Sequence, residues 1–436
     1  MSQATATRVI APARNLLGSL RLPGDKSISH RYALLGGFAN GTTHLENFST
    51  GADPASSLGC VAALGAKVER DGASITIHGC GGHFQPAAVP LDCGNSGSTM
   101  RMLAGLLAGQ HNSPPSPFTL IGDSSLSRRP MERIRKPLET MGARITLTER
   151  HAPLTIHGAP LKAIDYTTPV PSAQVKTAVL FAGLQASGTT TVTESVRTRD
   201  HGEIALEAFG AKLTRHRDTT SISGGQSLQG VNTVIPGDIS SAAFFLCAAA
   251  LFPDSGLLLD NLGLNPTRAT LLDVLATLGA KTSVLNLEQR SGELAGTVQL
   301  VAPKDGLSGA TISGALAAQL IDELPVLAAI APYTRHGIRI RDARELRVKE
   351  SDRIALVAEN LRRMGAEVTE VEDGLDVPGG QALHGAEIDS GGDHRIAMAF
   401  SVAALRADGE STIQGAESAN ISFPEFFSLL DQVVVH

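Results

Sequence analysis

The stretch Pro23-Gly24-Asp25-Lys26-Ser27-Ile28-Ser29-His30-Arg31 predicts a turn that opens a helix. Pro-Gly is a turn signal, and either Asp25 or Ser27 is a good helix N-cap. Apolar residues at near-helical spacing then continue through residues 28–38. Lys26 therefore stands at the N-terminal end of a helix.

The polar residues of this stretch are suited to an anion. Ser27 and Arg31 are four residues apart and share one helical face. A helix N-terminus already favours anions through its free N–H groups and its dipole. An added ammonium, hydroxyl and guanidinium would clamp a phosphate or a carboxylate. An ordinary capped helix with solvated charges explains this stretch equally well.

A second stretch, Pro236-Gly237-Asp238-Ile239-Ser240, repeats the first and also opens an apolar helix, predicted over 241–251. Pro, Gly, Asp and Ser recur, which indicates a structural role as turn and cap. Lys26 is replaced by Ile239, so the turn does not need a cation. The comparison favours a functional role for Lys26.

A shorter pattern, Gly-Ala after a helix-like segment and before a strand-like one, occurs five times. Glycine there suits a helix C′ position with left-handed φ, after which the chain leaves as a strand. A spacing of roughly 70–85 residues indicates small α/β modules, about six in this length. The copies lie at Gly65-Ala66, Gly142-Ala143, Gly210-Ala211, Gly279-Ala280 and Gly365-Ala366.

The two similar halves predict an α/β protein of two lobes built from the same module. Residues 21–235 should form the first lobe, and residues 1–20 with 236–436 the second. The N-terminal segments 8–10 and 17–20 are expected to pair as strands with the second lobe. We expect the active site in the cleft between the lobes.

Composition excludes several classes of function. A net charge of −6, no Trp and only three Tyr argue against nucleic-acid or membrane partners. The four cysteines show neither metal-ligand nor disulfide spacing, so no metal and a reducing cytoplasm are expected. Residues 1–15 lack a signal-peptide core, and the apolar run 242–252 is too short to span a bilayer.

Further turn-to-helix junctions carry polar groups, although each alone could be a solvated turn. In the first half they are Gly94-Asn95-Ser96-Gly97-Ser98-Thr99-Met100-Arg101, Ser127-Arg128-Arg129-Pro130, Ser172-Ala173-Gln174-Val175-Lys176 and Arg197-Thr198-Arg199-Asp200-His201. In the second half Asp393-His394-Arg395 opens the helix predicted over 396–405. A cleft that gathers these cations would bind a small, multiply anionic ligand or pair of ligands.

Two carboxylates are candidates for proton transfer. Asp322 lies inside the apolar segment 315–331, where a carboxylate tends to have a raised pKa, as a general base needs; a cap before Pro325 is the alternative. If residues from Lys349 onward are helical, Lys349, Glu350 and Arg353 face the same way. Such a face is often only solvated charge. No dinucleotide fingerprint is present.

These stretches together resemble the 5-enolpyruvylshikimate-3-phosphate synthase family, in order and over nearly the whole chain. The resemblance rests also on Ile321-Asp322-Glu323, on residues 346–353 and on the Asp-His-Arg triplet at 393–395. It implies two lobes, each of three βαβαββ units, in the inside-out α/β barrel of the enolpyruvyl transferases. The first lobe would form the shikimate 3-phosphate side, and no metal or cofactor is implied.

The resemblance also implies roles for individual residues. The shikimate 3-phosphate contacts would be Lys26, Ser27, Arg31, Ser172, Ala173, Gln174, Asp322 and Lys349. The phosphoenolpyruvate contacts would be Lys26, Asn95, Gly97, Arg129, Gln174, Arg353 and Arg395. Asp322 with Lys26 would deprotonate the 5-hydroxyl, and Glu350 would handle the proton at the methylene carbon. Closure of the lobes on substrate and a monomeric state are expected.

The chain departs from the family pattern at Ile421, where many members have a Lys. Gly97 stands where some glyphosate-tolerant members carry Ala, which favours sensitivity. Reduced sensitivity is nevertheless expected, because Ile421 and four stretches resemble the tolerant subclass: residues 24–26, 172–176, 199–203 and Asn265-Pro266-Thr267-Arg268.

Two other functions compete with this reading. The sister enolpyruvyl transferase, which acts on UDP-N-acetylglucosamine, has Lys-Asn where this chain has Lys26-Ser27, and a loop cysteine as acid; here Cys93 lies beside Asn95 instead. A non-catalytic anion-binding protein of the same fold would be favoured if Asp322 or Glu350 were missing, and both are present.

Overall fold

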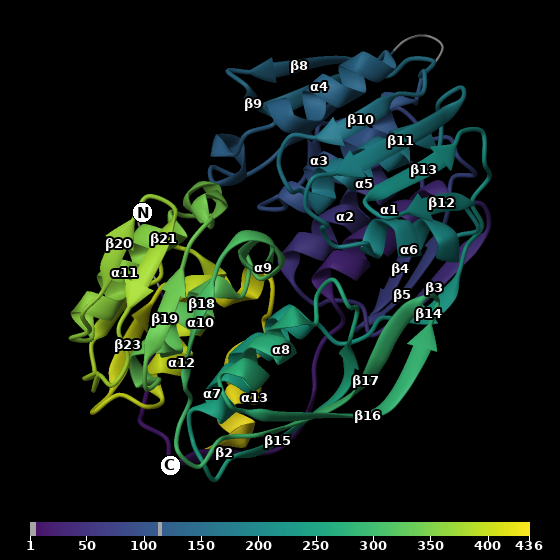
Figure 1. Cartoon of the computed structure of the whole chain (residues 1–436). Coiled ribbons are helices and arrows are strands. Elements are labelled where there is room, and N and C mark those ends of the chain that lie inside the picture. The colour runs from purple at the N-terminus through teal and green to yellow at the C-terminus, as the bar shows by residue number, and fades with distance from the viewer. Residues whose placement is uncertain (1–5, 112–115) are drawn as a thin grey trace. The chain divides into compact units, whose positions relative to one another are not determined.

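The computed structural model describes residues 6–111 and 116–436 (Figure 1). The chain forms two compact units. The first-half unit contains Gly24–Ile235 and Gln289–Glu293. The second-half unit contains the described residues up to Pro23, Pro236–Glu288 and Leu294–His436.

The first-half unit repeats one sheet topology. Its sheets have the orders β14-β3-β5-β4, β6-β7-β9-β8 and β10-β11-β13-β12. In each, the first pair of strands is parallel and the other two pairs are antiparallel. The strands are β3 (Thr42–Glu46), β4 (Lys67–Asp71), β5 (Ser74–His78), β6 (Leu91–Asp92), β7 (Phe118–Ile121), β8 (Arg144–Thr148), β9 (His151–His157), β10 (Asp165–Thr168), β11 (Thr189–Glu194), β12 (Leu213–His216), β13 (Thr219–Ser223) and β14 (Asn232–Val234).

Three helices of this unit are buried on every side, whereas its strands alternate. Helices α1 (Lys26–Phe38), α3 (Gly97–Ala108) and α5 (Ala173–Gly183) bury nearly all residues beyond their first turns. A helix that is apolar all round belongs in a core, and an alternating strand covers it with one face. Helices therefore lie inside and sheets outside. The remaining helices are α2 (Ala52–Ala63), α4 (Glu132–Met141), α6 (His201–Ala208) and the short 3-10 helix η1 (Leu126–Arg128).

The second-half unit follows the same plan. Its sheets have the orders β18-β19-β21-β20, β1-β23-β22 and β16-β17-β15-β2-β24. The strands are β1 (Thr7–Ile10), β2 (Asn15–Arg21), β15 (Gly256–Gly263), β16 (Lys281–Arg290), β17 (Glu293–Val301), β18 (Gly309–Ile312), β19 (Gly337–Ile340), β20 (Thr369–Val371), β21 (Gly374–Val377), β22 (Glu387–Asp389), β23 (Ser411–Gln414) and β24 (Val434–Val435).

The buried helices of this unit are α7 (Ile239–Ala250), α10 (Leu324–Ile330) and α12 (His394–Ala404). Around them lie α8 (Thr270–Thr277), α9 (Gly314–Gln319), α11 (Arg353–Arg363) and α13 (Phe426–Val433), with the 3-10 helices η2 (Ala331–Tyr333), η3 (Arg344–Val348) and η4 (Ala416–Ile421). The described residues thus form six small open sheets, and no sheet among them closes into a barrel.

Two strands complete a sheet in one unit and lead directly into a helix of the other. Strand β2 precedes α1, yet it pairs with β15 of the second-half unit. Strand β14 precedes α7, yet it pairs with β3 of the first-half unit. The pairing of β1 with β23 and of β2 with β15 confirms that the N-terminal segments join the second half of the chain.

The predicted glycine turns are confirmed. All five glycines of the repeated Gly-Ala pattern have left-handed φ after a helix: Gly65 at 106°, Gly142 at 119°, Gly210 at 93°, Gly279 at 102° and Gly365 at 88°. The predicted caps are confirmed too. The carboxylate of Asp25 accepts a hydrogen bond from the amide of Ile28 at 2.9 Å, and Asp238 caps α7.

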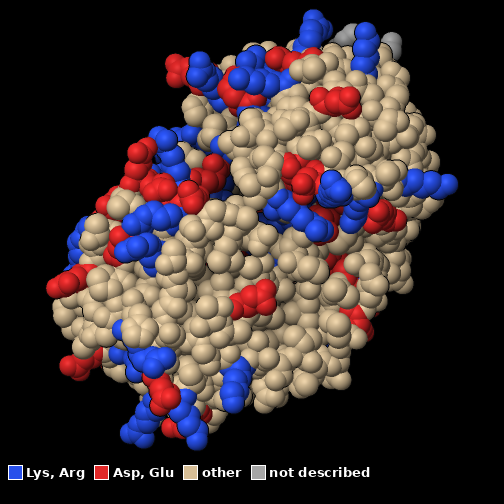
Figure 2. Space-filling view, viewed as in Figure 1, with Lys and Arg blue, Asp and Glu red and all other residues tan. Residues whose placement is uncertain are grey.

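Charge is dispersed on the one face of the molecule that Figure 2 draws. On the face drawn in Figure 2, Lys and Arg are interspersed with Asp and Glu between uncharged areas. In the part of the chain that the structure describes, no helix has the length and apolar character that crossing a bilayer requires.

Gly210→Ala tests the left-handed turn in isolation. Gly210 is exposed and a Cβ there would meet no atom within 4 Å, so only backbone strain opposes the change. We expect a loss of about 1 kcal/mol of unfolding free energy in urea titration.

Gly59→Ala is the matched control, because Gly59 lies exposed in α2 of the same unit with equally open space. Alanine suits a helix, so this variant should gain about 0.5 kcal/mol. Equal effects of the two variants would contradict the turn assignment.

Candidate active site

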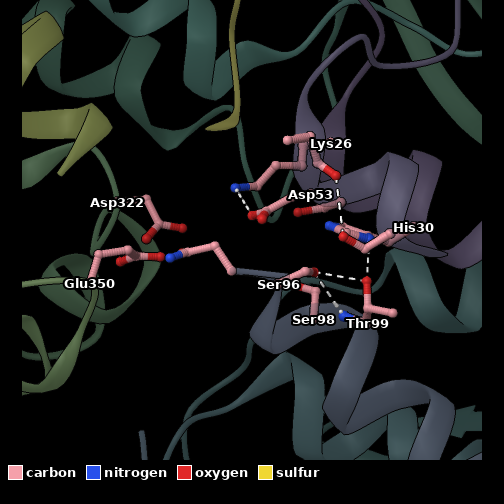
Figure 3. Close-up of polar contacts among 12 residues, drawn as sticks. Lys26, His30, Asp53, Ser96, Ser98, Thr99, Asp322 and Glu350 are labelled. Carbon is pink, nitrogen blue, oxygen red and sulfur yellow. Dashed lines mark hydrogen bonds and ion pairs between the residues drawn. The ribbon is translucent and has the colours of Figure 1, made fainter. Parts of the chain in front are cut away.

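The N-terminus of α1 places Lys26 beside a carboxylate (Figure 3). Asp25 caps the helix, so Lys26 is its first residue. The Lys26 Nζ lies 3.0 Å from Oδ2 of Asp53, which stands in the first turn of α2 and is buried. The contact holds the ammonium in one place with its charge partly exposed.

Arginines gather one turn further along α1. Arg31 is buried and donates to the Ser27 carbonyl at 2.8 Å and to the Thr177 hydroxyl on α5 at 3.2 Å. Arg199 donates to the Ser27 hydroxyl at 3.4 Å. Burial, with a contribution from the charge of Arg199, lowers the pKa of Arg31 to about 10. Arg31 stays charged at neutral pH, and a bound anion would relieve the repulsion.

The start of α3 supplies an amide and a guanidinium. Ser96 caps α3, so Gly97 is its first residue. Asn95 donates to Asp123 at 2.7 Å and accepts from Arg129 at 2.7 Å. A Cβ on Gly97 would lie 3.0 Å from Nη1 of Arg101 and 3.5 Å from Nη1 of Arg129. Glycine therefore leaves room in front of these two guanidiniums.

The start of α5 adds a hydroxyl and a second amide. Ser172 caps the helix and Ala173 is its first residue. Gln174 accepts from Arg101 at 2.6 Å and donates to Ser98 on α3 at 2.9 Å. The first turns of α3 and α5 are thereby joined. We call the polar residues at the N-termini of α1, α3 and α5, with Asp53, Arg129 and Arg199, the Lys26 cluster.

A buried hydroxyl network joins the helices that carry this cluster, and no sequence motif indicated it. Nδ1 of His30 lies 2.8 Å from Ser57 Oγ, which lies 2.8 Å from Thr99 Oγ1 (Figure 3). Thr99 in turn donates to Ser96 at 2.8 Å. Burial and the charges of Lys26 and Arg31 hold the pKa of His30 well below its usual value. The imidazole is therefore neutral at pH 7 and links α1, α2 and α3.

Asp322 stands between α9 and α10 in the second-half unit and meets two cations. Its Oδ1 lies 3.4 Å from Nζ of Lys349 and 3.7 Å from Nη1 of Arg353. The segment around Asp322 is apolar, as predicted, but the carboxylate itself, with 14% of the side chain exposed, lies against charge. Glu350 comes from the loop before α11 and accepts from Arg353 at 2.7 Å.

Arg353 is the most constrained cation of this group. Its Nε and Nη2 donate to the two oxygens of Asp393, at 2.8 and 3.1 Å. Burial alone would lower the pKa of Arg353, but Asp393 and Glu350 outweigh it and raise that pKa above its ordinary value. The reverse holds for Asp393, whose pKa Arg353 lowers despite burial. Both groups are charged, and the fork fixes the guanidinium.

Arg395 follows Asp393 into α12. The Asp393 carboxylate caps the helix by accepting from the Arg395 amide at 2.9 Å. The Arg395 guanidinium donates to the Asp322 carbonyl at 2.6 Å and to the Ser240 hydroxyl at 2.7 Å. We call Asp322, Lys349, Glu350, Arg353, Asp393 and Arg395 the Asp322 cluster.

One local prediction is wrong. Residues 349–352 are not helical: η3 ends at Val348, and α11 begins at Arg353 with Asp352 as its cap. Lys349 and Glu350 therefore share no helical face with Arg353. The Asp352 carboxylate accepts from the Ala355 amide at 3.0 Å, and this cap starts the helix later than the charge pattern suggested.

The structure brings the predicted residues together as two clusters, one in each unit. Sequence reasoning missed Asp53, Asp123, Thr177 and the His30 network, because each is joined to the cluster by contacts distant in sequence. Ile421 is the last residue of η4, in the second-half unit.

A family model described as EPSP synthase (3-phosphoshikimate 1-carboxyvinyltransferase) matches residues 10–430. The chain belongs to the EPSP synthase family. The family resemblance predicted from the motifs is thereby confirmed, and the motifs at 23–31, 94–101, 172–174 and 393–395 occupy the N-termini of buried helices.

Relatives and solved structures of this family match nearly the full length of the chain. A 3-phosphoshikimate 1-carboxyvinyltransferase of Koribacter versatilis is 61% identical, over 98% of each chain. One of Synechocystis is 49% identical, over 96% of this chain and 94% of the relative. An EPSP synthase structure from Acinetobacter baumannii matches with a TM-score of 0.87 at 40% identity, over 98% of each chain. The predicted enolpyruvyl transferase fold is confirmed.

His30→Asn tests the buried neutral imidazole. The folded state of the wild type resists protonating His30, whereas the unfolded state binds a proton below about pH 6.5. The wild type therefore keeps its full free energy of unfolding above that pH. Below it, that free energy decreases by about 1.4 kcal/mol for each pH unit. Urea unfolding between pH 5 and 7.5 should show a shallower fall in the variant.

His44→Asn, on the exposed side of β3, is the control and should keep the wild-type slope. Parallel slopes for wild type and His30→Asn would show that His30 titrates normally in the folded protein.

Proposed function

We propose that this chain transfers the enolpyruvyl group of phosphoenolpyruvate to the 5-hydroxyl of shikimate 3-phosphate and releases phosphate. Membership of the EPSP synthase family is the observation that carries the reaction. The reaction belongs to the shikimate pathway, which supplies chorismate and the aromatic amino acids. The residue roles below go beyond family membership and are proposed from the motifs and from the geometry of the two clusters.

The Lys26 cluster is suited to two anionic substrates. Ser27, Arg31 and the first turn of α5, with Ser172 and Gln174, would hold shikimate 3-phosphate together with Asp322 and Lys349. Lys26, Asn95, Gly97, Arg129 and Gln174 would hold phosphoenolpyruvate together with Arg353 and Arg395. The support is charge. Lys26, Arg31 and Arg101 lie in the first two turns of α1 and α3, whose N-termini favour anions, and Arg129 and Arg199 lie in the segments just before α4 and α6.

The Asp322 cluster is suited to proton transfer. Asp322, assisted by Lys26, removes the proton of the 5-hydroxyl as its oxygen adds to C2 of phosphoenolpyruvate. Glu350 delivers a proton to the methylene carbon, which gives a tetrahedral intermediate. The Glu350 carboxylate then takes a proton back from the methyl group as the C–O bond to phosphate breaks, which gives the enol ether and free phosphate. Fixed guanidiniums such as Arg353 stabilise the developing charge.

The proposal needs no metal or cofactor, since lysine and arginine supply the positive charge. With Ile421 in place of a lysine, the phosphoenolpyruvate cations would be Lys26, Arg129, Arg353 and Arg395. Both clusters come from one chain, so we propose that the enzyme acts as a monomer. We also propose that it is cytoplasmic and that its two lobes close around both substrates.

Asp322→Ala tests the base. Loss of a general base costs about 100- to 10,000-fold in rate, so phosphate release from phosphoenolpyruvate with shikimate 3-phosphate should fall by that factor. Asp376→Ala is the control, because Asp376 also pairs with arginines in the second-half unit; it should retain wild-type release.

The same assay separates the alternatives. Release with UDP-N-acetylglucosamine instead of shikimate 3-phosphate would assign the sister reaction. Here Cys93 offers no support for that reaction, because its contact with Cys60 and its burial raise the pKa of the thiol. If phosphate is released with neither acceptor, the alternative of a non-catalytic anion-binding protein is favoured.

Gly97→Ala tests the phosphoenolpyruvate side. The added methyl would crowd the guanidiniums of Arg101 and Arg129, so the KM for phosphoenolpyruvate should rise about tenfold while the KM for shikimate 3-phosphate changes little. Inhibition by glyphosate should weaken in parallel. Steady-state kinetics with each substrate varied in turn measures this, with Gly59→Ala as the control.

A larger rise in the KM for shikimate 3-phosphate would contradict the placement of Gly97. We also propose that the wild type is less sensitive to glyphosate than the sensitive subclass. Inhibition equally tight at matched phosphoenolpyruvate would refute that proposal.

A further inference from the structure

A buried chain of polar contacts lies behind Arg395 in the second-half unit. The Arg395 guanidinium donates to the Ser240 hydroxyl at 2.7 Å. That hydroxyl donates to Oε1 of Glu323, and the same oxygen lies 3.4 Å from Nη2 of Arg268. The order is therefore Arg395, Ser240, Glu323, Arg268. Neither Glu323 nor Arg268 was given a role by the motifs.

These residues come from four different segments around the core. Ser240 lies in α7, Glu323 caps α10, Arg395 lies in α12, and Arg268 stands in the turn before α8. Ser240, Glu323 and Arg268 are each no more than 3% exposed. A buried carboxylate is costly unless donors surround it, so Glu323 is held by its hydroxyl and guanidinium partners. The contacts thus fix the relative placement of these segments.

Arg395 also connects this chain to the proposed base. Its Nη1 donates to the backbone carbonyl of Asp322 at 2.6 Å, while its Nη2 donates to Ser240. Asp322 and Glu323 are adjacent in sequence, so the contacts close a ring. Movement of the Glu323 side chain would disturb both the Arg395 guanidinium and the peptide that carries the Asp322 carboxylate.

The two halves of the chain use this serine in parallel ways. Ser27 and Ser240 occupy the same place in the repeated Pro-Gly-Asp-x-Ser stretch. The Ser27 hydroxyl accepts from Arg199, and the Ser240 hydroxyl accepts from Arg395. In the second half the hydroxyl has an additional partner, the Glu323 carboxylate. Ser27 is half-buried, whereas Ser240 is buried and its hydroxyl bonds to the Glu323 carboxylate inside the unit.

We propose that Ser240 and Glu323 are positioning residues that aim the Arg395 guanidinium at phosphoenolpyruvate, with Arg268 as the counter-charge that keeps Glu323 in place. The inference rests on the proposed role of Arg395. Neither positioning residue needs to touch substrate. Loss of the Ser240 hydroxyl leaves one Arg395 donor without this acceptor and leaves Glu323 without its hydroxyl donor, and a buried polar group left unmatched is costly.

Ser240→Ala should lower kcat/KM for phosphoenolpyruvate about tenfold, the loss expected for one hydrogen bond to a charged group. The KM for shikimate 3-phosphate should change less than twofold. Ser240→Thr keeps the hydroxyl and should restore most of the activity. Ser241→Ala, the next position of α7, is the matched control and should match wild type. Glu323→Gln keeps an oxygen for the hydroxyl and should lose less activity than Glu323→Leu.

A double-mutant cycle separates positioning from general loss of stability. If Ser240 acts through Arg395, Ser240→Ala should have almost no further effect in an Arg395→Ala background, although each change alone lowers kcat/KM. Thermal unfolding of every variant checks that the protein is folded at the assay temperature. Multiplicative effects in the cycle, or equal loss for both substrates, would overturn the inference.

The cycle also distinguishes the inference from the function on which it rests. If Arg395→Ala lowers kcat/KM for phosphoenolpyruvate and Ser240→Ala does not, the positioning role alone is overturned. An Arg395→Ala variant with wild-type kinetics for phosphoenolpyruvate would overturn both the positioning role and the proposed role of Arg395.

Discussion

The burial of six helices on every side is the constraint on which the rest of the structure depends. Helices such as α1 and α7 are buried along nearly their whole length, so they must lie inside their units, and the amphipathic strands must cover them. The few buried polar side chains along them, such as His30 and Arg31, bond to other helices, and their N-termini need partners for free N–H groups. Polar residues therefore concentrate at helix starts, where caps such as Asp25 and Asp393 order the chain.

Charge at these helix starts is held by opposite charge more than by solvent. Arg353 and Asp393 are both buried and joined by two hydrogen bonds. Such a pair is weak evidence for stability, because desolvation offsets much of the attraction. Its value is geometric, since a forked guanidinium cannot rotate away. A preorganised cation of this kind stabilises charge that develops in a transition state, without reorganisation during the reaction.

The two clusters divide the proposed chemistry. The Lys26 cluster gathers cations around the N-termini of α1 and α3, and the start of α5 adds a hydroxyl and an amide, which suits recognition of phosphate and carboxylate groups. The Asp322 cluster alternates carboxylates with cations, which suits proton transfer next to a developing charge. The buried contacts behind each cluster, through His30 in one and Glu323 in the other, extend the functional unit beyond the residues that would touch substrate.

The sequence by itself determined the local features: the turn and cap before α1, the left-handed glycines after helices, and the repeated α/β module. These depend on a few neighbouring residues, so their signal is contiguous. Family motifs then named most residues of both clusters. Only the tertiary structure decided that Lys26 pairs with Asp53 and that Glu323 is joined to Arg395 through Ser240. Those contacts join segments tens of residues apart, and their partners are chosen by packing of the buried helices rather than by local sequence.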